Sequence, residues 1–65
     1  MKFAEAYDIM MKGGRVRRKG WGGFWYINKY GEVVIHLKGG YELVNVSDNL
    51  RLTIDNTLST DWEEV

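Results

Sequence analysis

The chain has 65 residues, with nine lysines and arginines, nine acidic residues, one histidine and no cysteine, and its formal net charge is zero. This length allows one domain, residues 1–65, and the absence of cysteine excludes disulfides and thiolate metal sites. No apolar run of about 18 residues is present, and no apolar signal core follows Met1, so we expect no membrane span and a cytoplasmic protein.

So small a domain usually needs a disulfide, a metal ion or self-association to be stable. A single histidine without cysteine does not build an ordinary zinc site. The chain also has nine aromatic residues, many for one small core. Aromatic side chains are enriched at protein interfaces and in ligand sites. We therefore predict a homo-oligomer.

Charge is divided unevenly between the two halves of the chain. Residues 1–31 contain seven lysines and arginines against two acids, a net charge of +5, and residues 32–65 contain two against seven, a net charge of −5. One interpretation is a localised anion site in the first half. The other is that the halves pair within one sheet and neutralise each other. The overall balance disfavours long nucleic acid, whose binding depends on many phosphate contacts.

The first predicted element is a helix over residues 2–12. Phe3, Ala6, Tyr7 and Met10 recur at the spacing of one helical face. Two glycines, at 13–14, follow the last periodic residue and can take the left-handed conformation that ends a helix.

The remaining elements are predicted to be short strands. Successive strands are expected at 15–19, with Val16 pointing inward, and at 24–29, 32–38 and 41–46, separated by turns at 30–31, 39–40 and 47–49. Residues 50–54 fit a further strand or extended segment, 55–60 a loop or one helical turn, and 61–65 a terminal strand. Short glycine turns join antiparallel neighbours. The predicted fold is therefore α+β, an N-terminal helix packed on a small antiparallel β-meander.

Evidence for catalysis is weak. His36 is the only histidine, and its side chain is expected to point away from Ile35 and Leu37 on a strand, as a surface or interface residue. A single histidine does not define a Ser-His-Asp arrangement, and no phosphate-binding P-loop is present. We expect neither an enzyme nor a bound cofactor.

The stretch Arg17-Arg18-Lys19-Gly20-Trp21, followed by Trp25 and Tyr26, is the strongest candidate for a binding site. Arginine bonds phosphate with a planar fork of donors, and a flat aromatic ring stacks on a nucleobase, worth about 1–3 kcal/mol. The glycines beside Trp21 leave room for a ligand. The alternative is that both tryptophans belong to the core and the arginines pair with acids of the second half.

Three motifs together point to a known family. They are Phe3-x-Glu5-Ala6 with Lys12-Gly13 at the end of the helix, Val16-x-Arg18-Lys19-Gly20-Trp21, and Leu58-x-Thr60-Asp61-Trp62-Glu63-x-Val65. In these motifs the chain resembles the second type of Thoeris anti-defence protein, small phage proteins that block the bacterial Thoeris defence. The resemblance spans nearly the whole chain, although residues 24–55 carry no family motif. Relatives commonly have asparagine after the tryptophan, where this chain has Gly22.

The resemblance implies a nucleotide sponge, which binds a cyclic ADP-ribose isomer, and in some relatives cyclic di- or trinucleotides, and withholds it from its effector without cleavage. It also implies a homo-oligomer, typically a tetramer, with ligand sites between subunits. Carried over by position, Arg18 is expected to contact phosphate, Trp21 to stack on a base, and Asp61 to accept hydrogen bonds from the ligand. Trp62 is expected to be a core residue. Arg17, Trp25 and Tyr26 are added from the residue pattern alone.

Two other functions also fit the sequence. The aromatic surface would also suit a protein–protein interaction module that inhibits a host defence enzyme directly. A small single-stranded nucleic-acid binder would use the same residue types, but the charge balance argues against it.

Overall fold

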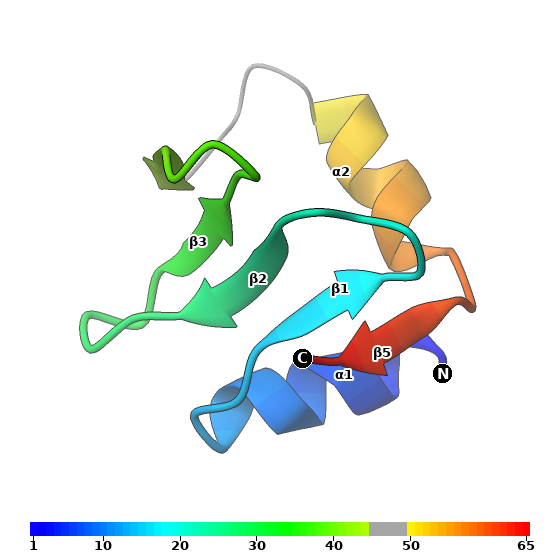
Figure 1. Ribbon diagram of the computed structural model, residues 1–65. Coiled ribbons are helices and arrows are strands. Elements are labelled where there is room, and N and C mark those ends of the chain that lie inside the picture. Colours follow the sequence, from blue (N-terminus) through cyan, green and yellow to red (C-terminus); the bar gives the residue numbers. More distant parts are fainter. Residues whose placement is uncertain (45–49) are drawn as a thin grey trace.

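The structure is a computed structural model that describes residues 1–44 and 50–65 (Figure 1). Its elements are α1 (Phe3–Met11), β1 (Val16–Arg18), β2 (Phe24–Ile27), β3 (Val33–His36), β4 (Glu42–Val44), α2 (Leu50–Thr57) and β5 (Trp62–Glu64). The predicted α+β class, with an N-terminal helix and an antiparallel sheet, is confirmed. Within the described ranges, no helix combines the length and the apolar character needed to cross a membrane.

The five strands form one sheet in the order β4-β3-β2-β1-β5, and every pairing is antiparallel. Strands β1 to β4 follow one another as the predicted meander. The terminal strand β5 returns to the other edge of β1, where Arg18 lies opposite Trp62. The last strand therefore lies beside the first, and it joins the two halves of opposite charge in one sheet (Figure 1).

Helix α1 ends as the two glycines predict. Gly13 adopts φ of +89°, and the N–H groups of Gly13 and Gly14 donate to the carbonyl oxygens of Met10 (3.0 Å) and Ile9 (2.9 Å). This is the Schellman arrangement, in which a left-handed residue turns the chain back and satisfies the last carbonyls of the helix. The chain then enters β1 directly.

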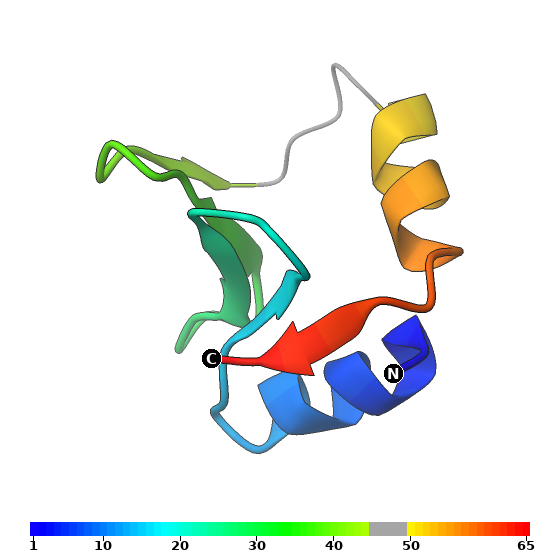
Figure 2. The same cartoon turned by 45° about the vertical axis from the view of Figure 1, so that its right-hand side comes forward.

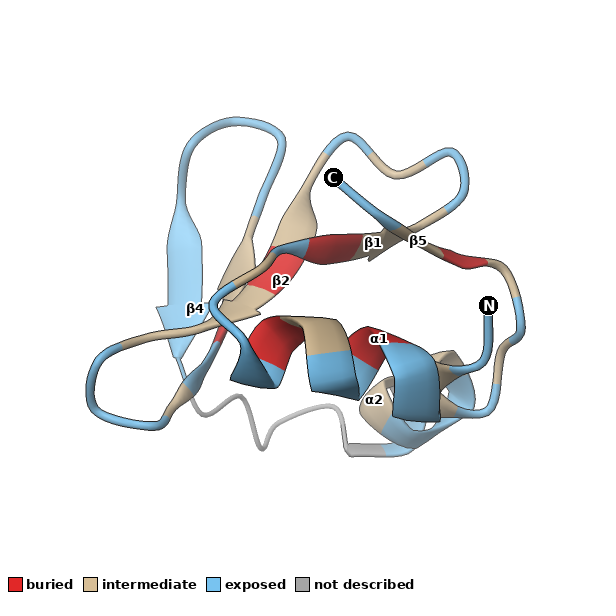
Figure 3. Ribbon diagram, turned by 90° about the horizontal axis from the view of Figure 1, so that it is seen from below, coloured by how far each residue is buried: buried red, intermediate tan, exposed pale blue. Residues whose placement is uncertain are grey.

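The core lies between α1 and the sheet, where Figure 3 shows the buried positions of helix and strands facing one another. Its buried residues are Ala6, Met10, Val16, Trp25 and Trp62. The inward position of Val16 and the core position of Trp62 are confirmed. Tyr7, predicted on the buried face, is 45% exposed. The buried stripe runs through Ala6 and Met10, which are one helical turn apart, so Tyr7 falls at its margin.

The prediction of a strand or extended segment over 50–54 is wrong, because α2 covers residues 50–57. The helical alternative for 55–60 is confirmed over residues 55–57, which form the end of α2. Ile54 accepts from the N–H of Leu58 (3.1 Å) and from the hydroxyl of Thr57 (2.7 Å). Alternation of Leu50, Leu52 and Ile54 favours a strand, but the spacing of Leu50, Ile54 and Leu58 equally fits a helix. The predicted turn at 47–49 and the end of the predicted strand at 45–46 lie outside the described residues.

Both helices border the same face of the sheet. Val16, Trp25, Ile35 and Leu43 are aligned across β1 to β4 on the face that packs on α1. In Figure 2, α1 lies below β1 and β5, and α2 stands upright across from β3 and β4. The α1-facing side of the sheet is thus covered at one end by α1, and its other end is bordered by α2.

Candidate functional site

A cavity of about 560 Å³ lies between the sheet and α2. Its lining comes from the loop between β1 and β2, from β2 and β3, from the β3–β4 hairpin and from α2, and comprises Gly20, Trp21, Gly22, Gly23, Phe24, Trp25, Ile35, His36, Leu37, Lys38, Leu43, Thr53 and Asn56. Ligand sites in proteins commonly have volumes of about 300–1,000 Å³ and a mostly apolar lining with a few polar groups. The cavity matches that description.

The floor of the cavity is a row of three apolar side chains in cross-strand register. Trp25 lies opposite Ile35, and Ile35 lies opposite Leu43. Trp25 is only 4% exposed, whereas Leu43 is 42% exposed. The floor therefore rises from the core at β2 to an open, solvent-facing end at β4.

Trp21 stands on the loop that enters β2. Its ring centroid is 5.8 Å from that of Trp25 and 5.3 Å from that of Trp62, so the core fixes the position of a side chain that is itself partly exposed. Gly23 is required beside it, because a Cβ there would collide with the carbonyl oxygen of His36. The glycine loop thus lets β2 start close to β3 while it places an indole at the cavity.

The polar groups of the lining come from α2 and from the segment after β3. Thr53 and Asn56 are three residues apart on α2, and so share one side of the helix; Lys38 follows β3. His36 also borders the cavity, but its imidazole is on the opposite face of the sheet, where Nδ1 contacts Glu42 at 3.0 Å. Sequence reasoning missed Thr53, Asn56 and Lys38 as site residues. The four-residue spacing of apolar residues from Leu50 to Leu58 was the available signal for the first two.

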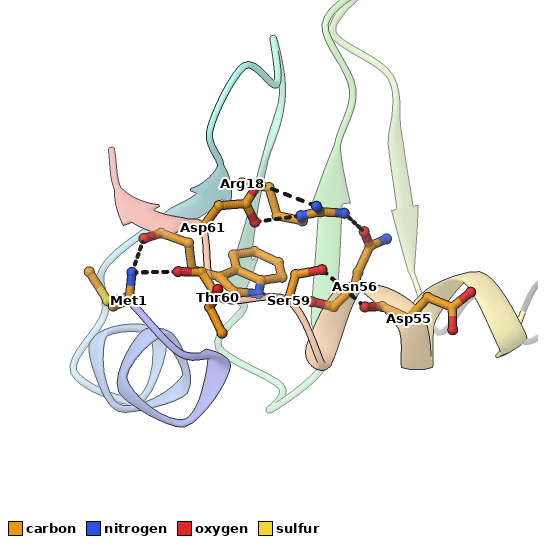
Figure 4. A network of polar contacts seen from close by, with 8 residues as sticks. Met1, Arg18, Asp55, Asn56, Ser59, Thr60 and Asp61 are labelled. Carbon is orange, nitrogen blue, oxygen red and sulfur yellow. Dashed lines mark hydrogen bonds and ion pairs between the residues drawn. The ribbon is translucent and has the colours of Figure 1, made fainter.

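Arg18 joins three segments of the chain beside this cavity (Figure 4). Its Nε donates to Oδ1 of Asp61 (2.7 Å), its Nη2 to Oδ2 of Asp61 (3.3 Å) and its Nη1 to Oδ1 of Asn56 (2.8 Å). The hydrogen bond from Arg18 lowers the pKa of Asp61, and the same bond raises the pKa of Arg18. Both groups are therefore charged at neutral pH. The same network includes the backbone nitrogen of Met1, which donates to the carbonyl oxygens of Thr60 and Trp62.

Arg17 and Tyr26 lie on the opposite face of the sheet. Arg17 pairs with Glu63 at 2.9 Å, and the Tyr26 hydroxyl donates to Glu42 at 2.9 Å. Glu42 also contacts Nδ1 of His36 at 3.0 Å, and hydrogen bonds from His36 and Tyr26 lower its pKa. The bond to Glu42 in turn raises the pKa of Tyr26. Neither Arg17 nor Tyr26 borders the cavity.

The six residues predicted for the site therefore fall into three groups. Trp21 and Trp25 border the cavity. Arg18 donates to Asn56, which lines the cavity, and Asp61 pairs with Arg18. Arg17 and Tyr26 are on the other face of the sheet. The alternative prediction is confirmed for both arginines, which pair with acids of the second half, and for Trp25, which belongs to the core. Trp25 offers a ligand little more than the margin of its ring, because Phe3 and Trp62 pack against it.

Among residues 1–44 and 50–65, no group of three or more histidine or acidic side chains is placed to hold a metal ion. Comparison with protein-family models, with curated proteins and with solved structures finds no match for the chain.

Proposed function

We propose that this protein binds a cyclic nucleotide signal, a cyclic ADP-ribose isomer or a cyclic di- or trinucleotide, and withholds it from its effector without cleaving it. The observation that carries the proposal is the cavity: a partly exposed indole, Trp21, borders a cavity with an apolar floor, and the lining also includes Asn56, Thr53 and Lys38. A nucleobase stacked on an indole gains about 1–3 kcal/mol. The resemblance to the Thoeris anti-defence family supports the same ligand class and a place of action in the host bacterial cytoplasm.

The charges at the cavity suit an anionic ligand of moderate size. Lys38 supplies a cation in the lining. Arg18 is outside the lining and donates to Asp61 and Asn56, so Lys38 is the cation that we assign to a phosphate. A compact ligand with one or two phosphates fits this arrangement better than a long polyanion, which needs many contacts along its backbone.

A homo-oligomer, in the simplest case a tetramer, belongs to the proposal. Leu43 on the cavity floor is 42% exposed, so a single chain leaves the cavity open to solvent. Large apolar side chains are exposed elsewhere too, notably Met11 at 61%, Tyr41 at 76% and Leu58 at 74%. A second copy would cover such surface and close the cavity across a symmetry axis.

Native mass spectrometry of the purified protein with a panel of cyclic ADP-ribose isomers and cyclic dinucleotides tests the proposal. We expect an oligomer that carries a stoichiometric ligand, which heat denaturation releases with its mass unchanged. A cleaved product would make the protein an enzyme, and no binding across the panel would refute the sponge for these ligands.

Two neighbouring residues of β4 give a matched pair of variants for this experiment. Leu43→Trp should fill the cavity and abolish binding, because Leu43 lies on its floor. Val44→Trp adds the same indole to a position of similar exposure, 45%, whose side chain points to the other face of the sheet. Val44→Trp should bind the ligand as the parent does, and equal binding by both variants would place the site elsewhere.

The second candidate is a protein–protein interaction module that inhibits a host defence enzyme. Tyr30 and Tyr41, at 74% and 76% exposed, favour it, because exposed tyrosines are common at interfaces. A sponge removes the nucleotide and needs no contact with the host enzyme. The interaction module would be favoured if inhibition of the host defence enzyme persisted in Leu43→Trp and disappeared in the double variant Tyr30→Ala/Tyr41→Ala.

A further inference from the structure

We propose that the NH₂ group of Asn56 donates a hydrogen bond to an acceptor on the ligand, and that Arg18 is a positioning residue that fixes the orientation of the Asn56 amide. This inference rests on the proposed function, because it concerns the same cavity. Asn56 would make the cavity selective for ligands that carry a hydrogen-bond acceptor, and Arg18 would act through Asn56 instead of contacting a phosphate directly.

The chemistry of the contact assigns the two ends of the Asn56 side chain. Nη1 of Arg18 lies 2.8 Å from the Asn56 amide. A guanidinium has donors only, so the amide atom that faces it must be the oxygen. The NH₂ group is then on the far side of the carboxamide from Arg18, as Figure 4 shows.

Hydrogen bonds fix the positions of both Arg18 and Asn56. Both carboxylate oxygens of Asp61 accept from Arg18, at 2.7 and 3.3 Å. The backbone of Asn56 is held by its carbonyl oxygen, which accepts from the indole Nε1 of Trp62 at 2.9 Å and from the N–H of Ser59 at 3.2 Å. The amide therefore has one orientation before any ligand arrives.

The NH₂ group of Asn56 is the donor that we assign to the cavity. Asn56 lines the cavity with Thr53, one helical turn before it, and no partner of its Nδ2 is found within residues 1–44 and 50–65. A polar group that loses water on ligand binding without gaining a partner is costly, so such a donor discriminates against ligands without an acceptor. With a base stacked on Trp21, the acceptor is a ring nitrogen or carbonyl oxygen on the edge of that base.

The test titrates cyclic ADP-ribose and cyclic di-GMP separately, by calorimetry, into the intact protein and its variants. Asn56→Asp keeps the oxygen that Arg18 needs, removes the donor and adds a negative charge, so its melting temperature should be retained while affinity for the bound probe falls about tenfold. The added carboxylate also repels an anionic probe, but near 1 M salt the Debye length is about 3 Å and this repulsion is screened. The part of the loss that comes from the missing donor should therefore persist at high salt.

Arg18→Lys separates positioning from direct contact. Lysine lacks the fork that reaches Asp61 and Asn56 together, so Arg18→Lys should weaken probe binding, and adding Asn56→Asp to it should cause little further loss. Additive losses would mean that Arg18 contacts the ligand itself and would overturn its positioning role. Binding by Asn56→Asp equal to the parent would overturn this inference alone. Failure of the parent to bind either probe would refute the proposed function for these ligands, and this inference with it.

Discussion

Trp62→Phe tests how α2, which lines one side of the cavity, is attached to the core. Trp62 is 2% exposed and packs against three other aromatic rings, Phe3 at 5.1 Å, Trp25 at 5.0 Å and Trp21 at 5.3 Å. Its Nε1 also donates to the carbonyl oxygen of Asn56 at 2.9 Å. The variant removes that donor and leaves a smaller ring in the same place, so it should loosen α2 as well as the core.

The magnitude follows from the two losses. Truncation of a buried tryptophan to alanine costs about 3–5 kcal/mol, and a phenyl ring retains most of those contacts, so the packing loss is about 1 kcal/mol. The lost hydrogen bond adds about 1 kcal/mol. The free energy of unfolding should fall by about 2 kcal/mol, which lowers the melting temperature of a domain this small by roughly 8–16 °C.

Trp25→Phe is the matched control, because Trp25 is similarly buried at 4% and its indole N–H is not part of the link to α2. Urea unfolding followed by circular dichroism should show a loss of about 1 kcal/mol for Trp25→Phe. Hydrogen exchange at the α2 amides should accelerate in Trp62→Phe and stay near the parent rate in Trp25→Phe. Equal losses of stability, with unchanged exchange at α2, would refute the attachment through Trp62.

Three further predictions concern single residues. The pKa of Asp61 lies below its ordinary value of 3.8, so the stability it contributes is complete above that value and is lost as pH falls through the lowered pKa; acid unfolding curves should show this loss in the parent and not in Asp61→Asn. Gly23→Ala should prevent folding, because its Cβ would collide with a backbone carbonyl of β3, whereas Gly39→Ala, whose Cβ meets its nearest atom at 3.6 Å, should stay folded by circular dichroism. Glu42→Gln should bring the raised pKa of Tyr26 back toward 10.0 in an ultraviolet titration, and an unchanged titration would mean that the carboxylate does not set it.

The candidate site shows where sequence reasoning reached its limit. Residue type and spacing predict Trp21, in the glycine-bracketed loop, as a site residue, and it does border the cavity. Tyr26 and Arg17 are close to it in sequence, and this proximity alone predicts them for the same site. Strand geometry separates them, since alternate residues point to opposite faces. The register of β2 on β3 then places Tyr26 beside Val34, on the face away from α1.

The other half of the site depends on contacts between distant segments. Residues 50–57 have both an alternating and a four-residue apolar pattern, so local sequence does not decide between strand and helix. The bonds from Trp62 and Arg18 to Asn56 connect α2 to β5 and β1. The pairing of β5 with β1, which no local pattern specifies, places these two donors beside each other.

The sequence alone determined the elements whose residues carry strong local signals. Helix α1 and its glycine end, the antiparallel meander with its turns, and the inward positions of Val16 and Trp62 all follow from period, turn chemistry and burial of apolar area. Tertiary structure alone decided the place of β5, the helical state of α2 and the pairing of Arg18 with Asp61. The physical reason is that the first group depends on residues within one turn or strand of each other, whereas the second depends mainly on groups far apart in the chain, such as Arg18 with Asn56 and Asp61, that meet only when the chain is folded.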